Sequence, residues 1–112
     1  MSRHDQNQLQ IKRWLEACRW QVVLTTSEGE KNVEAMGFPD GIAFRSAVIV
    51  LFETKPYLKG VDPFTQLSQN QIKFHAKWEG APIYVLRDET DCFELYKKEI
   101  ARLKAQLEPL EE

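Results

Sequence analysis

The sequence predicts an α/β fold, in which a mixed β-sheet is flanked by helices in the order α-β-β-β-α-β-α. Segments with apolar residues at spacings of three and four predict the helices, and segments rich in β-branched residues predict the strands. Three strands in succession imply an antiparallel meander, and the strand-helix-strand step implies a right-handed parallel crossover. Together these patterns predict an α/β sandwich.

Length and composition predict one soluble domain. The chain has 112 residues, of which 43% are hydrophobic and 29% charged, and such values are ordinary for globular proteins. We expect a single domain over residues 1–112, with a core at about 5–87 and a C-terminal helix at about 90–107. The polar N-terminus lacks the apolar part of a signal peptide, and no apolar run reaches the roughly 20 residues that span a bilayer. We therefore expect a cytoplasmic protein that does not contact membranes.

The beginning of the chain predicts one helix and two short strands. Residues 5–19 form an amphipathic pattern, and its apolar side carries Leu9, Ile11, Trp14, Leu15 and Cys18. Residues 20–26 are β-branched and aromatic, which predicts a strand, and the polar residues 27–36 predict a loop. Residues 42–45 predict a second short strand, which a tight connection joins to the next one.

Residues 48–55 are the best strand of the chain. Its first part is apolar on both faces, which predicts a central strand covered by helices on both sides. Pro56 ends this strand because proline cannot donate to a β-ladder. Residues 56–67 then predict a loop that carries Tyr57, Leu58, Val61 and Phe64. This loop either contacts a substrate or partner over a site, or folds down on its own apolar side chains.

The second half of the chain predicts two helices and one strand. Ser68 is a good cap for a helix over 69–79 that Gly80 ends, and residues 82–87 predict a strand. Thr90 can cap the final helix. Apolar residues of this last helix form a stripe, which we expect to pack on the sheet of the domain or on a second subunit: Phe93, Tyr96, Ile100, Leu103 and Leu107.

Charged residues stand in unusual places at the ends of two apolar strands. Asp40 lies in a Pro-Asp-Gly turn before one strand, and Glu53 and Lys55 end the next one on the same face. Charges at the end of a buried strand are costly unless they are paired, solvated or bound to a metal. We therefore expect Asp40, Glu53 and Lys55 to converge on a metal-dependent phosphodiesterase centre.

These residue types suit the hydrolysis of a phosphodiester. Mg²⁺ prefers hard oxygen ligands, and Asp40, Glu53 and the backbone carbonyl of Thr54 are candidates for them. Lys55 could orient the attacking water, and Gln71 could hold that water or a phosphate oxygen without adding charge. His4 and His75 stand alone in the sequence, and a histidine on a helix face is more often a surface residue than a catalytic one.

The distribution of charge permits contact with phosphates. The formal net charge is −2, but residues 41–87 hold six Lys or Arg against three Asp or Glu. Residues 88–112 hold eight acids and four bases, so a basic middle adjoins an acidic end. Candidate DNA contacts in the middle are Arg45, Lys59, Ser68, Lys73 and Lys77.

Three groups of residues occur in a distinctive order: Gly37-Phe38-Pro39-Asp40, then Glu53-Thr54-Lys55, then Leu67-Ser68 with Gln71 and Phe74. Followed by Gly80 and a strand, this order resembles the virus-type replication-repair nuclease (VRR-NUC) group of the PD-(D/E)XK nuclease superfamily, over about residues 6–87. The resemblance implies a restriction-endonuclease-like fold, Mg²⁺ or Mn²⁺ as cofactor and DNA as substrate. It also implies that Asp40, Glu53 and Lys55 carry catalysis and that Gln71 assists.

Members of this size resemble Holliday-junction resolvases of phages and bacteria, which are typically homodimers. The resemblance therefore implies branched DNA as a partner, a homodimer, and a bacterial or phage-infected cell. The family usually has a glutamate on its first helix, shortly before an Ile/Leu-Gln pair, which Leu9-Gln10 matches here. Gln6 stands at the position of that acid and Asp5 adjoins it, so either Asp5 binds the metal or the metal site is altered.

Two functions follow as hypotheses. The first is a metal-dependent, structure-selective DNA endonuclease of replication, repair or recombination. The second is a homodimeric module that binds branched DNA or a protein and has weak or lost nuclease activity, and the glutamine at position 6 prompts it.

Overall fold

The computed structural model describes residues 3–25 and 37–107, and side chains from residue 6 onward within these ranges. Within these ranges eight elements follow one another, and their order agrees with the predicted one apart from a short 3-10 helix, η2. They are α1 (Arg3–Ala17), β1 (Gln21–Leu24), β2 (Gly41–Arg45), β3 (Val48–Thr54), η2 (Pro63–Gln66), α2 (Gln69–Lys77), β4 (Ile83–Leu86) and α3 (Glu89–Leu107). The predicted loop at 27–36 lies outside the described residues.

The four strands form one mixed sheet in the order β1-β2-β3-β4. β1 pairs with β2 and β2 with β3 in antiparallel fashion, whereas β3 and β4 are parallel. The predicted meander and the parallel pairing across the helical connection are therefore confirmed. The tight connection between β2 and β3 is confirmed as well, and Ser46 adopts a left-handed backbone conformation there, with a φ of 53°.

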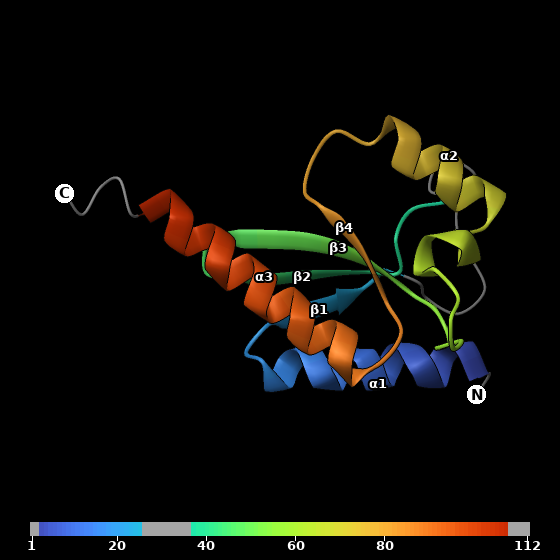
Figure 1. Cartoon of the computed structure of the whole chain (residues 1–112), viewed down its shortest axis with the longest axis horizontal. Coiled ribbons are helices and arrows are strands. Elements are labelled where there is room, and N and C mark those ends of the chain that lie inside the picture. The colour runs from blue at the N-terminus through green and yellow to red at the C-terminus, as the bar shows by residue number, and fades with distance from the viewer. Residues whose placement is uncertain (1–2, 26–36, 108–112) are drawn as a thin grey trace.

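The core lies between one face of the sheet and the helices α1 and α3, which cross below it and in front of it (Figure 1). Alternate residues of β3 point into this core, because successive side chains of a strand lie on opposite faces. The buried apolar side chains of the core are Ile11, Leu15, Trp20, Ala43, Val48, Val50, Phe52, Leu86, Cys92 and Leu95.

The second face of the sheet differs from the prediction. β3 is central, as predicted, but Ile49, on the face of the sheet opposite the core, is 53% exposed. Val23 of β1 is 51% exposed. α2 lies beyond the carboxyl end of β3 rather than over the middle of the sheet (Figure 1). The prediction that helices cover both faces along this strand is therefore wrong. The reason is that α2 has only nine residues and packs against the segment before β2, as described below.

The last helix begins and ends close to its predicted bounds and crosses α1 and β4. Its buried residues are Cys92, Leu95 and Glu99. The predicted apolar stripe is only half-buried in the middle, and its end residues Phe93 and Leu107 are 51% and 46% exposed. No helix in residues 3–25 or 37–107 is both long and apolar enough to cross a membrane.

Candidate active site

Asp40 and Glu53 lie at the adjoining ends of β2 and β3. Gly41 pairs with Phe52, so the two acids occupy the next positions along neighbouring antiparallel strands. The structure buries both residues, with Asp40 3% exposed and Glu53 0% exposed. Burying an ionised carboxylate costs several kcal/mol, as an order of magnitude, unless hydrogen bonds or opposite charges compensate it. Two such groups at one sheet edge therefore need an organised polar environment.

Asp40 is held by Thr54, the last residue of β3. Its Oδ2 accepts hydrogen bonds from the backbone N–H of Thr54 at 2.8 Å and from the Thr54 hydroxyl at 3.0 Å. The carbonyl of Asp40 accepts from the N–H of Thr25, at 2.9 Å, which fixes its backbone beside the end of β1. Of Thr54 only the backbone carbonyl was predicted to belong to the site, whereas its side chain and N–H both contact Asp40.

The carboxylate of Glu53 contacts α2. Its Oε1 accepts a hydrogen bond from Gln71 Nε2 at 3.2 Å, and its Oε2 lies 2.9 Å from Nε2 of His75. Nε2 of His75 donates in this contact when it carries the ring proton and the Glu53 carboxylate is ionised. Both donors come from one face of α2, because residues four apart in a helix lie on the same side.

His75 was predicted to be a lone surface histidine, but it lies beside the Glu53 carboxylate with a side chain only 16% exposed. A signal for it was present in the sequence. His75 follows Gln71 by four residues on a helix, so the two side chains lie on the same face and can contact the same partner.

The amide of Gln71 is oriented by the start of its own helix. Ser68 and Gln71 form a capping box, in which Gln71 N–H donates to Ser68 Oγ at 3.2 Å and Ser68 N–H donates to Gln71 Oε1 at 2.8 Å. Because Oε1 is used by the cap, the NH₂ group must face Glu53. The hydroxyl of Ser68, a predicted DNA contact, serves this cap.

α2 is pinned to the segment that leads into Asp40. Gly37 has a φ of +84°, and a Cβ on it would lie 2.3 Å from the carbonyl oxygen of Asn70. Phe38 packs edge-on against Phe74 with ring centroids 5.3 Å apart, and Trp78 stacks on Phe74 at the same distance. The three sequence groups that carry the family resemblance are therefore brought together in space.

α1 reaches the site through residues that were not predicted. The side-chain amide of Asn7 donates to the backbone carbonyl of Lys55 at 3.0 Å, and Gln8 is buried, with 4% of it exposed. Gln6 lies on the exposed side of the helix, and the side chain of Asp5 lies outside the described part. Lys55 itself is half-buried and follows Glu53 on the same face of the strand.

The candidate DNA contacts lie at two ends of the molecule. Lys59 is exposed on the loop after β3, and Lys73 and Lys77 are exposed on α2, so all three belong to segments that adjoin the site. Arg45 ends β2 at the opposite end of the sheet, where its guanidinium lies 5.2 Å from the centroid of the Tyr96 ring. The structure thus separates Arg45 from the carboxylates.

The donor set suits a hard cation that keeps several waters. Within the described residues no three His, Cys, Asp or Glu side chains gather in a way that could hold a metal ion. Mg²⁺ needs fewer, because one or two carboxylates together with waters commonly suffice. Asp40, Glu53 and the Thr54 carbonyl are oxygen donors of that kind, so the residues present fit Mg²⁺ or Mn²⁺.

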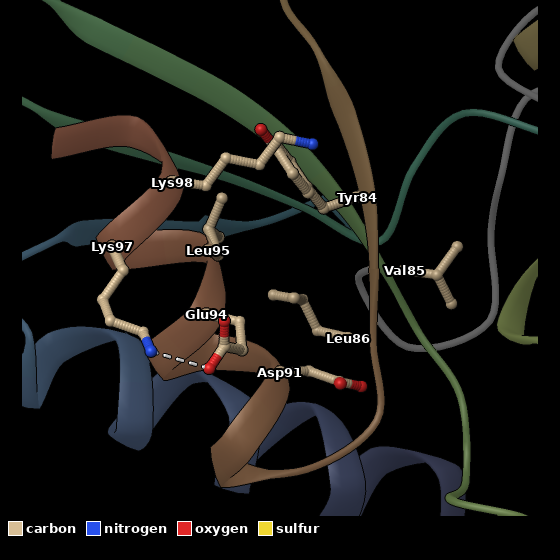
Figure 2. Close-up of a pocket in the computed structure, with 8 residues that line it drawn as sticks. All are labelled: Tyr84, Val85, Leu86, Asp91, Glu94, Leu95, Lys97 and Lys98. Carbon is tan, nitrogen blue, oxygen red and sulfur yellow. Dashed lines mark ion pairs between the residues drawn. The ribbon is translucent and has the colours of Figure 1, made fainter. Parts of the chain in front are cut away.

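A groove of about 580 Å³ lies elsewhere, between β4 and α3 (Figure 2). Leu86 and Leu95 line it, and the ion pair of Lys97 and Glu94, 2.9 Å long, crosses one side of it. The hydroxyl of Tyr84 donates to the buried Glu99 at 2.6 Å, and burial together with this carboxylate raises the pKa of Tyr84 well above its ordinary value. None of the predicted site residues lines this groove.

No protein-family model matches the chain, and no curated protein or solved structure matches it either.

Proposed function

We propose that this protein is a metal-dependent DNA endonuclease that hydrolyses phosphodiester bonds in branched DNA, with a restriction-endonuclease-like core. The observation that carries the proposal is the pair of buried carboxylates, Asp40 and Glu53, at adjoining strand ends. Both are fixed by directed hydrogen bonds, as the ligands of a metal usually are. The family resemblance of the same residues supports the same reaction.

Asp40, Glu53 and the Thr54 carbonyl would hold the cation, which when bound neutralises charge on the phosphate and activates water. Thr54 fixes the Asp40 carboxylate, and Gln71 and His75 fix that of Glu53, so neither needs to reorient when substrate arrives. Lys55, on the same face as Glu53, would orient the attacking water or stabilise the charge that develops on the phosphate.

The protein acts as a homodimer under this proposal, because two symmetric nicks in a junction need two centres. The alternative function is a homodimeric module that binds branched DNA or a protein and has weak or lost nuclease activity. The exposed position of Gln6 favours that alternative, since the first helix then lacks a described acidic ligand at the site.

Cleavage assays separate the two functions. We expect the protein to cut a labelled four-way junction or flap in Mg²⁺ or Mn²⁺, to cut linear duplex less, and to be inactive in EDTA. Glu53→Ala and Lys55→Ala should each reduce cleavage by about 100-fold or more. His75→Ala, which removes a positioning group, should reduce it by about 10- to 100-fold.

Glu94→Ala and Lys97→Ala serve as matched controls, because this exposed acid-base pair lies on α3 away from the site. Both should cut at the wild-type rate. Cleavage that survives Glu53→Ala and Lys55→Ala would falsify the assigned centre, whereas tight binding of the junction without cleavage would favour the alternative. Sedimentation of the same preparation should give about twice 13.1 kDa.

A further inference from the structure

The loop between Lys55 and Ser68 begins and ends at the candidate site. Lys55 lies two residues after Glu53, and Ser68 caps the helix whose Gln71 and His75 contact Glu53. Whatever binds against this loop therefore lies beside the carboxylates.

Side chains and caps brace the backbone of the loop. Gln66 Nε2 donates to the carbonyl of Pro56 at 2.9 Å, which closes the loop near its base. Arg87 donates to the carbonyl of Val61 at 2.9 Å and is itself paired with Asp91 at 3.2 Å. Asp62 caps η2 by accepting from the N–H of Phe64. Hydrogen bonds within the loop and one from Arg87 outside it therefore specify its conformation.

This braced loop holds its large apolar side chains out in solvent. Tyr57, Leu58, Val61 and Phe64 are 54%, 48%, 37% and 56% exposed. Of the two interpretations that the sequence left open, folding of the loop onto its own apolar side chains therefore does not occur. A rigid loop that presents aromatic rings is suited to contact with another molecule.

The ring of Tyr57 is already stacked against a cation on one of its faces. The guanidinium of Arg87 lies 5.0 Å from the centroid of the Tyr57 ring, so one face of the ring is covered by a cation. The ion pair with Asp91 and the bond to Val61 hold that cation in place. Since more than half of Tyr57 remains exposed, its other face is available for a flat aromatic group.

The positive charge of residues 55–77 indicates what kind of molecule would stack on Tyr57. Residues 55–77 contain four lysines and one acid, Asp62, in a chain whose formal net charge is −2. Lysines interleaved with exposed aromatic rings are typical of surfaces that bind single-stranded nucleic acid, where bases stack on rings and lysines meet phosphates. A partner protein with an apolar surface would gain nothing from this local excess of positive charge.

We propose that Tyr57 and Phe64 form a stacking surface for unpaired bases beside the scissile phosphate, with Tyr57 as its principal residue. This rests on the proposed nuclease function and narrows its substrate to DNA that offers unstacked nucleotides next to the cut. Junctions, flaps and gaps share that property, and perfect duplex lacks it.

Binding in EDTA tests the contact without any cleavage. The probes are a perfect duplex and the same duplex with a short single-stranded gap that contains 2-aminopurine. Wild type should bind the gapped DNA roughly ten-fold more tightly and change the 2-aminopurine fluorescence, as stacking does. Tyr57→Ala should lose this preference and the fluorescence change while its affinity for duplex stays the same, and Tyr57→Phe should retain both.

Phe93→Ala is the matched control. Phe93 is 51% exposed and has a lysine ammonium 5.1 Å from its ring centroid, yet it lies with Arg45 and the end of α1, away from the loop. This variant should bind both probes as wild type does, with its assembly checked by sedimentation.

The proposal is overturned if Tyr57→Ala keeps the preference for gapped DNA, if it loses both probes equally, or if its main defect is loss of self-association. Failure of the nuclease proposal looks different. In that case wild type cuts no DNA in Mg²⁺ or Mn²⁺, while the difference between Tyr57→Ala and wild type on the gapped probe is still measured in EDTA.

Discussion

Two buried carboxylates, Asp40 and Glu53, make part of the protein interior polar. Glu53 and Asp40 are buried next to the core, and their hydrogen-bond partners include a threonine for Asp40 and a glutamine with a histidine for Glu53. Hydrogen bonds to charged groups contribute about 1.5–3 kcal/mol each, roughly twice the value of neutral pairs. Hydrogen bonds of this kind therefore offset part of the cost of burying each carboxylate.

Cys92 shows how burial affects the protonation of a thiol in the core. It is 1% exposed in the core, and burial, aided by the negative charge of Asp91, raises the pKa of its thiol to about 12. The folded protein holds this proton more tightly than the unfolded chain does. The contribution to stability is therefore complete below the ordinary thiol pKa and is lost as the pH rises toward the folded value.

We expect the unfolding free energy of wild type to fall above about pH 9, by up to about 1.4 kcal/mol per pH unit from this thiol. Urea unfolding in reducing buffer at several pH values measures it. Cys92→Ala should lack this part of the decline, whereas Cys18→Ala, at a half-buried thiol, should keep it. Parallel declines in wild type and Cys92→Ala would contradict the assignment.

At the scale of elements, α2 depends on one glycine. Gly37 combines a left-handed backbone with direct contact to the carbonyl of Asn70, so a side chain there meets two penalties. Gly60 has a φ of +75° but nothing within 4 Å of its Cβ position, so a side chain there meets only the first. The two glycines form a natural pair for measurement.

Gly60→Ala should destabilise the protein by about 1 kcal/mol, from the left-handed conformation alone. Gly37→Ala should cost about 2–4 kcal/mol and also reduce cleavage, because α2 must move and carries Gln71 and His75 with it. Thermal or urea unfolding of both variants tests this. Equal losses of stability would mean that the contact with Asn70 is not tight in solution.

Local signals explain how much of the fold the sequence predicted. The strands are short β-branched runs, and α2 begins at a capping box that is visible as Ser68-x-x-Gln71, so these elements could be found from neighbouring residues. The position of α2 could not, because it depends on Phe38 meeting Phe74 from a distant segment. The exposed Ile49 follows from that position, and the sequence offered no sign of it.

The same distinction applies to the site. Asp40, Glu53 and Gln71 were predicted from motif and alternation, and they remain predictions as catalytic residues. Gln8 precedes the buried Ile11 and Leu15 by three and seven residues and shares their side of α1, whereas Gln6 lies on the exposed side. The apolar pattern alone did not select Gln8, because it counts only apolar residues. Asn7 contacts a backbone carbonyl, which no side-chain pattern reveals.

At the scale of the whole molecule, the described residues have two dissimilar ends. One carries the carboxylates, the braced loop and the lysines of residues 55–77, and the other carries Arg45, Tyr96 and the exposed Phe93. Under the proposed function, DNA at the carboxylates would meet the lysines of residues 55–77 and not Arg45.

Salt dependence of DNA binding measures this asymmetry. In EDTA, Lys59→Ala and Lys73→Ala should weaken binding to any DNA sequence and reduce the slope of log affinity against log salt by about 0.9 each, because each removes one phosphate contact. Arg45→Ala, which removes an equal charge at the other end, should leave the slope unchanged. A loss of slope in Arg45→Ala equal to that of the lysine variants would contradict this orientation of the DNA.

The amide of Gln71 has a consequence for which side chains position 71 can accept. A capping box works equally well with glutamate or glutamine, so the start of α2 by itself leaves two choices. The buried carboxylate of Glu53 lies 3.2 Å from the Gln71 amide nitrogen and would repel a glutamate at position 71. Glutamine is therefore the only one of the two that fits. The oxygen of Gln71 is required by the helix cap, and its nitrogen is required by the adjacent Glu53 carboxylate. Only the two requirements together specify glutamine at this position.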